Sequence, residues 1–253
     1  VGNAAVANAK PDGYTILMAL SSITVIPAAD ALFARKPAYS LDQFMPIALI
    51  SADPTLLVVH PSLPVKSLKE LVALARSKPG QMSFSSSGIY GALHMPMEMF
   101  LHAAKLKMRH VPTNGGGPAI TALLGGHVEM TAGGPAAISG HVKAGKMRPI
   151  VSWGAKRHEA YPKVPTFKEL GYDIEYYIWA GMFAPKGTPE PVMKVLRDAA
   201  RKTVEDPDFK KTMANLSSPI QYMDAPEFTK YWEADGKRLA ALVKVVGKVE
   251  AKK

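Results

Sequence analysis

The chain of 253 residues contains no cysteine, which excludes disulfide bonds, thiolate catalysis and zinc sites of the cysteine type. It has no run of about 18 apolar residues, so no segment is predicted to span a membrane. Its first residues, Val1–Val6, carry neither a charged leader nor an apolar signal core. Hydrophobic residues make up 47% and charged residues 21% of the chain, the composition of a globular protein with one large domain or two ordinary ones.

Several motifs of enzyme chemistry are missing as well. The chain has no Walker loop, no dinucleotide-binding glycine turn and no hydrolase elbow, and Ser87 has Ser85 rather than glycine two positions before it. The seven histidines include no H-E-x-x-H pair. We therefore expect no catalytic residues, no metal and no cofactor.

The net charge of +10 suits nucleic acid, an acidic membrane surface or an anionic ligand. The lysines and arginines are scattered along the chain. The basic run Lys105–His110 and the tail Ala251–Lys253 lack the interleaved aromatic residues of single-strand binders. Both are predicted to be solvated surfaces, and no nucleic acid partner is expected.

Three small-residue turns each separate a short apolar run from a helix-like stretch: Ser85–Gly88, Gly115–Pro118 and Gly133–Pro135. In alternating α/β folds such turns lie at the carboxyl ends of strands, where backbone N–H groups at helix N-termini bind anions. Hydroxyl and amide donors, but no carboxylate pair or general base, lie beside them. The turns thus favour reversible anion binding, although ordinary strand-to-helix connections would show the same composition.

The pattern around these turns predicts alternating strands and helices. Strands are expected at Tyr14–Leu20, Ile47–Ser51, Thr55–Val59, Met82–Ser85, Met108–Val111, Val128–Thr131, Pro149–Trp153, Tyr172–Phe183 and Ile220–Met223. Helices are expected from Ser67, whose capping box includes Glu70, to Pro79 and at 92–104, 118–124, 135–144, Pro189–Val204, Pro207–Leu216 and Pro226–Val246. This alternation indicates a largely parallel sheet.

The central block, residues 53–175, contains all three turns and is predicted to form one α/β domain. Residues 1–52 and 176–253 then form the other, discontinuous domain. A domain inserted between two halves of another is the plan of hinged binding proteins, although periodicity by itself also allows a single domain.

Six segments carry a family resemblance. They are Lys10–Thr15, Ser86–Gly88 with Gly91 and His94, Gly115–Ala119, Leu123–Glu129, Lys143–Arg148 and Pro162–Thr166. In order and spacing they resemble the periplasmic substrate-binding proteins of tripartite tricarboxylate transporters, also called Bug proteins, over essentially the whole chain.

The resemblance implies an α/β, two-domain Venus-flytrap fold of the periplasmic-binding-protein type. It implies an extracytoplasmic solute-binding protein without enzyme activity, which captures a small organic carboxylate in an interdomain cleft and delivers it to two membrane subunits. A periplasmic monomer is expected, with a signal peptide outside this sequence.

The resemblance also implies the binding residues. In the second domain these are Ser87, Gly88, Tyr90, Gly91, Thr113, Asn114, Gly115, Gly116, Gly117, Gly133 and Gly134. From the first domain, Ser21 and Ser22 would face the same cleft, with Trp179 near the hinge. Alanine at Thr113 or Asn114 is expected to weaken binding with little loss of fold.

The chain departs from the family pattern in three places. Many relatives have Tyr-Lys where this chain has Thr113-Asn114, and Asp-Asn where it has Gly133-Gly134, so a direct lysine contact is lost. Tyr90, Met95 and Trp179 suggest an apolar or aromatic carboxylate. The family also opens with a strand and a glycine-rich loop that precede the first residue here, so the first domain is expected to be N-terminally incomplete and to bind weakly.

Two alternatives remain open from the residues. An α/β enzyme acting on a phosphorylated or carboxylated small molecule would use the same turns. A ligand-sensing module that signals by closure would share the binding site.

Overall fold

The computed structural model describes residues 2–249, which divide into two compact units. The first unit comprises the residues up to Ala52 and Trp179–Lys248, and the second comprises Asp53–Ile178 with Val249. The chain passes between the units inside two strands, β2 (Phe44–Pro54) and β8 (Tyr177–Pro185). Val1 and the predicted basic tail Ala251–Lys253 lie outside the described residues.

The first unit contains a four-stranded sheet in the order β1-β8-β2-β9. Its remaining elements are α1 (Gly2–Ala7), β1 (Leu17–Leu20), α2 (Ser22–Leu32), a 3₁₀ turn (Leu41–Gln43), α7 (Glu190–Glu205), α8 (Pro207–Asn215), β9 (Ile220–Asp224) and α9 (Ala225–Val246). Strand β1 runs antiparallel to β8, and β2 runs antiparallel to β9. The prediction of a largely parallel sheet is wrong for this unit, because its strands come from distant parts of the chain and alternation with helices does not set their direction.

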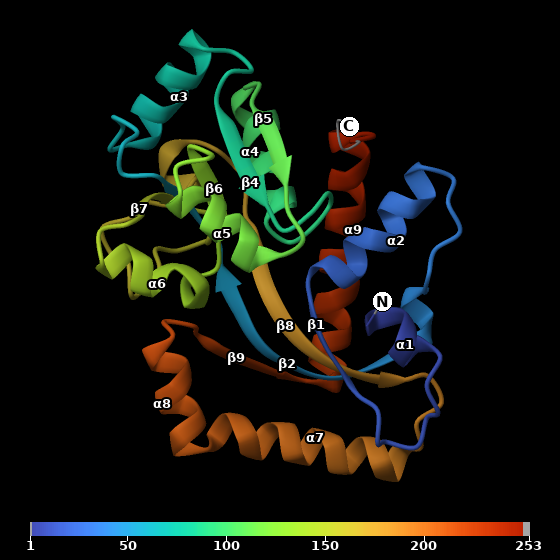
Figure 1. Cartoon of the computed structure of the whole chain (residues 1–253). Helices are drawn as coiled ribbons and strands as arrows, with labels where there is room; N and C mark the ends of the chain where they lie inside the picture. Colours follow the sequence, from blue (N-terminus) through green and yellow to red (C-terminus); the bar gives the residue numbers. More distant parts are fainter. Residues whose placement is uncertain (1, 250–253) are drawn as a thin grey trace. The chain divides into compact units, whose positions relative to one another are not determined.

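Strand β8 is buried on both faces. Trp179 and Phe183 pack against Phe228 of α9, with ring centroids 5.7 and 5.2 Å apart. Met182 and Ala184, which point the other way, belong to the core formed with α7. Helices therefore cover both faces of the sheet (Figure 1), which explains why apolar residues follow one another along this strand without polar alternation.

The second unit contains a five-stranded sheet in the order β5-β4-β6-β3-β7. Its elements are β3 (Leu56–Val59), α3 (Leu68–Ser77), β4 (Ser83–Ser86), α4 (His94–Ala104), β5 (Arg109–Pro112), α5 (Gly116–Leu124), β6 (Met130–Gly133), α6 (Pro135–Lys143), β7 (Arg148–Ser152) and a 3₁₀ turn (Lys168–Leu170). Strands β5 and β6 each pair with β4 in parallel, whereas β3 is antiparallel to both of its neighbours. The parallel part of the prediction is thus confirmed for the three strands that precede the small-residue turns.

Helix α3 shows how closely local sequence sets these elements. The Ser67 hydroxyl accepts a hydrogen bond from the Glu70 amide at 3.2 Å, and the Glu70 carboxylate accepts one from the Lys66 amide at 2.6 Å. Leu68, Leu71 and Ala75 are buried on one face. The predicted N-terminal capping and the apolar face are both confirmed.

Two helices were not predicted from the sequence, α1 and α2. Helix α2 is apolar on most of its surface and contains Pro27, so it shows no amphipathic period. It packs on α9, where Nε1 of Trp232 donates to Oγ1 of Thr24 at 3.1 Å. Within residues 2–249, no helix is both long enough and apolar enough to cross a membrane.

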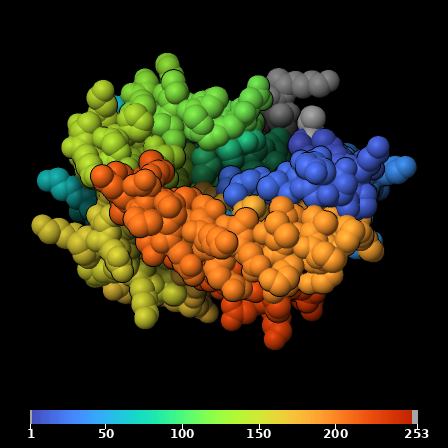
Figure 2. Space-filling view, turned by 90° about the horizontal axis from the view of Figure 1, so that it is seen from below, coloured from blue at the N-terminus to red at the C-terminus, as the bar shows by residue number. Residues whose placement is uncertain are grey.

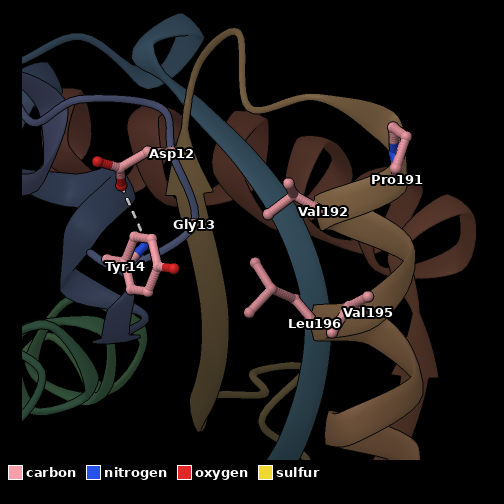
Figure 3. Close-up of a pocket in the computed structure, with 7 residues that line it drawn as sticks. All are labelled: Asp12, Gly13, Tyr14, Pro191, Val192, Val195 and Leu196. Carbon is pink, nitrogen blue, oxygen red and sulfur yellow. Dashed lines mark hydrogen bonds between the residues drawn. The ribbon is translucent and has the colours of Figure 1, made fainter.

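Helix α7 lies at the surface of the first unit beside the N-terminal segment (Figure 2). A pocket of about 400 Å³ separates the two and is lined by Asp12, Gly13, Tyr14, Pro191, Val192, Val195 and Leu196 (Figure 3). Apart from Asp12 and Tyr14 its lining is apolar. The Tyr14 amide donates to Oδ1 of Asp12 at 3.0 Å, which closes the turn on which both residues lie.

Candidate functional site

The three small-residue turns lie at one edge of the second unit's sheet. Strands β5, β4 and β6 are neighbours and parallel, so their carboxyl ends meet at the same edge. Each strand is followed by a helix, α5, α4 and α6 respectively. The predicted position of the turns, between strand ends and helix starts, is confirmed.

None of the three helix starts is capped by a side chain. Helix α5 begins after Gly115 at φ +150°, a region that favours glycine, and α6 begins after Gly134 with a proline in its first turn. The residue before α4 is Leu93, which has no capping side chain either. The Gly116 and Gly117 amides that open α5 thus lie at a helix start where an external anion can accept hydrogen bonds. At α4, by contrast, the amides of Leu93, His94 and Met95 donate within the turn, to Oγ of Ser87 and to the Gly91 carbonyl.

The turn between β4 and α4 is tight. The Gly91 amide donates to the Gly88 carbonyl at 3.0 Å, and the Leu93 amide donates to Oγ of Ser87 at 3.3 Å. A Cβ atom on Gly91 would lie 2.7 Å from that Oγ and 3.0 Å from the Gly88 carbonyl oxygen. Glycine at position 91 is therefore required by close approach, and Gly88 is required by its φ of +114°.

The turn between β5 and α5 is held to β4 by Thr113. Its Oγ1 lies 2.8 Å from the carbonyl oxygens of both Ser86 and Gly115, and its amide donates to the Ser86 carbonyl at 3.0 Å. Asn114, by contrast, is exposed, as is Gly117. The two neighbouring candidates thus differ, because the hydroxyl of Thr113 is used within the protein whereas the amide of Asn114 faces solvent.

The third turn is built by close packing. Gly133 ends the buried strand β6, and a Cβ atom there would lie 2.5 Å from Cγ2 of Ile138. A Cβ atom on Gly134 would meet only Ile178, at 3.8 Å. Gly133 is therefore a packing residue, whereas Gly134 is the one at the helix start.

Tyr90 and Met95 are both buried in the second unit. The Tyr90 amide donates to Nδ1 of His94 at 3.1 Å, and its hydroxyl oxygen accepts a hydrogen bond from the Val249 amide at 2.9 Å. Met95 has no exposed surface. These side chains are occupied by packing, so they give no support to an aromatic or apolar ligand.

Ser21, Ser22 and Trp179 belong to the first unit. Ser21 is buried and immediately precedes α2, which begins at Ser22. Trp179 is fully buried, and its Nε1 donates to Oδ2 of Asp235 at 2.8 Å. Its indole is enclosed by the core of the first unit, and its place in the binding site stays a prediction.

The turns are electrically neutral. Residues 86–93, 113–117 and 133–137 include no Asp, Glu, Lys or Arg. Across residues 2–249, no three His, Asp or Glu side chains gather closely enough to hold a metal ion. The arrangement therefore offers hydrogen-bond donors without a formal charge.

Sequence reasoning missed one feature behind the β4–α4 turn, a stacked pair of histidines. The rings of His94 and His110 lie 4.1 Å apart, and Phe84 stacks on His110 at 4.9 Å. Burial, and then the electrostatic effect of the neighbouring His94 ring, lower the pKa of His110 to about 3. His110 belongs to the run Lys105–His110 that was predicted to be a solvated surface, and that prediction is wrong for this residue. The only sequence signal for the stacked pair was His94 in the family motif.

The full chain also matches a family of known proteins. The model of the tripartite tricarboxylate transporter family receptor, TctC, matches residues 1–248. This chain belongs to the TctC family.

Solved structures agree with that membership. The periplasmic binding protein BugD has a TM-score of 0.88 and 27% identity, with 97% of this chain and 82% of that chain covered. An R. palustris protein with adipate has a TM-score of 0.89 and 26% identity, with 97% and 82% covered. MatC from Rhodopseudomonas palustris, with bound malate, has a TM-score of 0.85 and 26% identity, with 96% and 83% covered.

The family and the fold are those of solute-binding receptors and not of enzymes. The fold class expected from the sequence, an α/β periplasmic-binding-protein fold, is confirmed. The enzyme alternative is thereby wrong. The prediction of a missing strand and glycine-rich loop before the first residue stays a prediction.

Proposed function

We propose that this TctC-family protein captures a small organic carboxylate at the turns after β4, β5 and β6 and delivers it to a tripartite transporter with two membrane subunits. We also propose that it acts in the periplasm as a monomer. The observation that carries the proposal is the convergence of three small-residue turns, each followed by a helix start, at one edge of a sheet. Two proteins with this fold hold carboxylates, adipate in one and malate in the other.

The chemistry of the turns suits a carboxylate. Its oxygens accept several hydrogen bonds, and backbone N–H groups at helix starts supply them together with the favourable end of the helix dipole. Gly116 and Gly117 open α5 without side chains, so a ligand approaches their amides closely. Asn114 adds an exposed amide beside them.

Because the turns are neutral, salt should affect this site differently from a site that contains a lysine. A site with a lysine attracts anions through a long-range charge, which salt screens. Here the donors are dipoles and act at short range, so we expect affinity to change less than about threefold between 50 and 500 mM salt. Discrimination between acids then rests on the number and spacing of hydrogen bonds.

The test is a thermal-shift panel on the native full-length protein with malate, adipate, monocarboxylates, tricarboxylates, aromatic acids, phosphates and nucleotides. A ligand at about 100 times its Kd stabilises the folded state by about 2.7 kcal/mol. Calorimetry on the best acid then gives Kd and stoichiometry, and mass spectrometry of the recovered ligand shows whether it is returned unchanged.

Asn114→Ala is the informative variant, with Asn215→Ala as its matched control. Asn215 is also exposed, but it ends α8 in the first unit. We expect the first substitution to weaken carboxylate binding and the second to leave it unchanged. A thermal shift with phosphates alone would contradict the proposed site. Equal carboxylate affinities of Asn114→Ala and Asn215→Ala would also contradict it.

A further inference from the structure

Two histidines connect the sheet to both ends of the β4–α4 turn, residues 87–93. His110 lies on β5, and His94 is the first residue of α4. Their rings stack with centroids 4.1 Å apart and an interplanar angle of 24°. Figure 1 shows β4, β5 and α4 beside one another in this unit.

His110 acts on the start of the turn through Ser86. Its Nε2 lies 2.6 Å from Oγ of Ser86, and that oxygen also lies 3.1 Å from the Gly88 carbonyl and 3.3 Å from the Gly88 amide nitrogen. All three contacts are satisfied together only when Nε2–H of His110 donates to Ser86 and the Ser86 hydroxyl donates to the Gly88 carbonyl. The lone pair of His110 is then on Nδ1.

His94 acts on the other end of the turn. The Tyr90 amide donates to its Nδ1 at 3.1 Å, which places the proton of the neutral ring on Nε2. That Nε2 lies 3.2 Å from Oε1 of Glu98. Tyr90 sits at φ +58°, a conformation that a non-glycine residue holds only when its surroundings impose it.

We propose that the stacked pair His94–His110 positions the β4–α4 turn for ligand binding, and that protonation of His110 in acid releases the turn and weakens binding. The effect on binding rests on the proposed function, which supplies the carboxylate ligand. The effect on the structure of the turn does not depend on that function. A proton on His110 places a positive charge against the face of a second imidazole.

The titratable and charged groups that face the pair are few. Glu98 and Tyr90 face His94, and the other histidine faces each ring. Burial, and then His94, lower the pKa of His110 to about 3 from an ordinary value of 6.5. Because the pKa is lower in the ordered turn than in a released one, the stabilisation is fully present above pH 6.5 and is lost progressively as pH falls toward 3.

The ordinary and the lowered pKa of His110 set an upper limit on how strongly acid favours the released turn. Between pH 7.5 and pH 5.0, uptake of one proton favours the released turn by about 30-fold. Carboxylate affinity, measured by calorimetry with adipate and with malate, is therefore expected to fall in the native protein by at most about this factor of 30.

The test compares His110→Gln with His102→Gln. Glutamine at 110 keeps an N–H donor for Ser86 and has no titrating group, and His102 is an exposed histidine on α4. We expect His110→Gln to lose the pH dependence that the wild type and His102→Gln retain. Protonation of the acid itself affects all three proteins equally, so the difference between them belongs to the histidine.

Hydrogen exchange of a peptide covering residues 84–97, corrected for the intrinsic pH dependence, reports on the turn without a ligand. Protection is expected to fall at pH 5.0 in the wild type and to persist in His110→Gln. If His110→Gln does not fold, Ser86→Ala takes its place, with protection of Gly88 expected to be low at both pH values. Identical pH profiles in wild type and variant overturn this proposal, whereas failure of the wild type to bind any acid overturns the proposed function.

Discussion

The indole Nε1 of Trp179 donates a 2.8 Å hydrogen bond to Oδ2 of Asp235, and both side chains are buried in the first unit. Arg238 donates to the other oxygen of the same carboxylate at 2.6 Å. A buried charge is tolerated when its hydrogen-bonding capacity is filled. The pair thus explains why a tryptophan near the point where the chain changes units belongs to the core.

Trp179→Phe is expected to destabilise the protein by about 2 kcal/mol, because it leaves a buried carboxylate short of one donor. Trp153→Phe is the matched control, since Trp153 is equally buried but its Nε1 has no hydrogen-bond partner among the described residues. Urea unfolding at pH 7 measures both. Carboxylate affinity of Trp179→Phe is expected to stay within about twofold of wild type, and a tenfold loss would support the ligand-facing role that the family resemblance implied.

Thr113 and Asn114, although adjacent, should respond differently to alanine. Thr113→Ala removes the hydroxyl that joins the turn to β4, so we expect a loss of about 1 kcal/mol in unfolding free energy. Thr113→Ser, which keeps the hydroxyl, should recover most of it. Asn114→Ala should change stability by less than about 0.5 kcal/mol while weakening carboxylate binding about fivefold. Equal stability losses at the two positions would contradict this division of roles.

Asp224 should make the stability of the folded protein fall at low pH. The hydrogen bond from Arg197, at 2.7 Å, is the main reason that the pKa of Asp224 falls from 3.8 to about 2. The folded state holds this carboxylate ionised, so its stabilisation is present above pH 3.8 and is lost as pH falls toward 2. Asp224→Asn keeps a capping oxygen for α9 but removes the charge. We expect it to cost about 1 kcal/mol at pH 7, after allowance for solvent screening, and progressively less below pH 4.

Urea unfolding of wild type and Asp224→Asn across pH 2–7 measures that difference. Asp173→Asn is the control, because its side chain is 97% exposed and lies 3.7 Å from Lys168. That control should stay within about 0.5 kcal/mol of wild type at every pH. A constant penalty for Asp224→Asn over the whole range would show that capping rather than charge is lost.

Gly13 and Val192 should be coupled. Gly13 has φ +88°, and a Cβ atom there would lie 2.3 Å from Cγ1 of Val192, within the pocket in Figure 3. We expect Gly13→Ala to destabilise by about 2–3 kcal/mol, from contact and backbone strain together. In the Val192→Ala background the same change should cost only about 1 kcal/mol, the strain that remains. Gly140→Ala, in helix α6 with nothing within 4 Å, should not destabilise. Additive penalties at positions 13 and 192 would rule out the contact.

Most elements of the fold were predictable because their signals are local. The capping serine of α3, the short strand-like runs at β4, β5 and β6 and the glycine and proline of the turns each act over a few residues. Helix α2 escaped prediction because a nearly uniform apolar segment has no period to read.

The amino-acid sequence by itself determined the order of strands and helices, the neutral small-residue turns and the family to which their combination belongs. Only the tertiary structure decided which side chains are available at those turns. Thr113 and Tyr90 looked like ligand contacts, but their polar groups hydrogen-bond within the second unit, Trp179 does so in the first, and His110 proved to stack behind a turn rather than face solvent. The physical reason is that partners distant in sequence fill a polar group's hydrogen-bonding capacity, and no local pattern records which partner arrives.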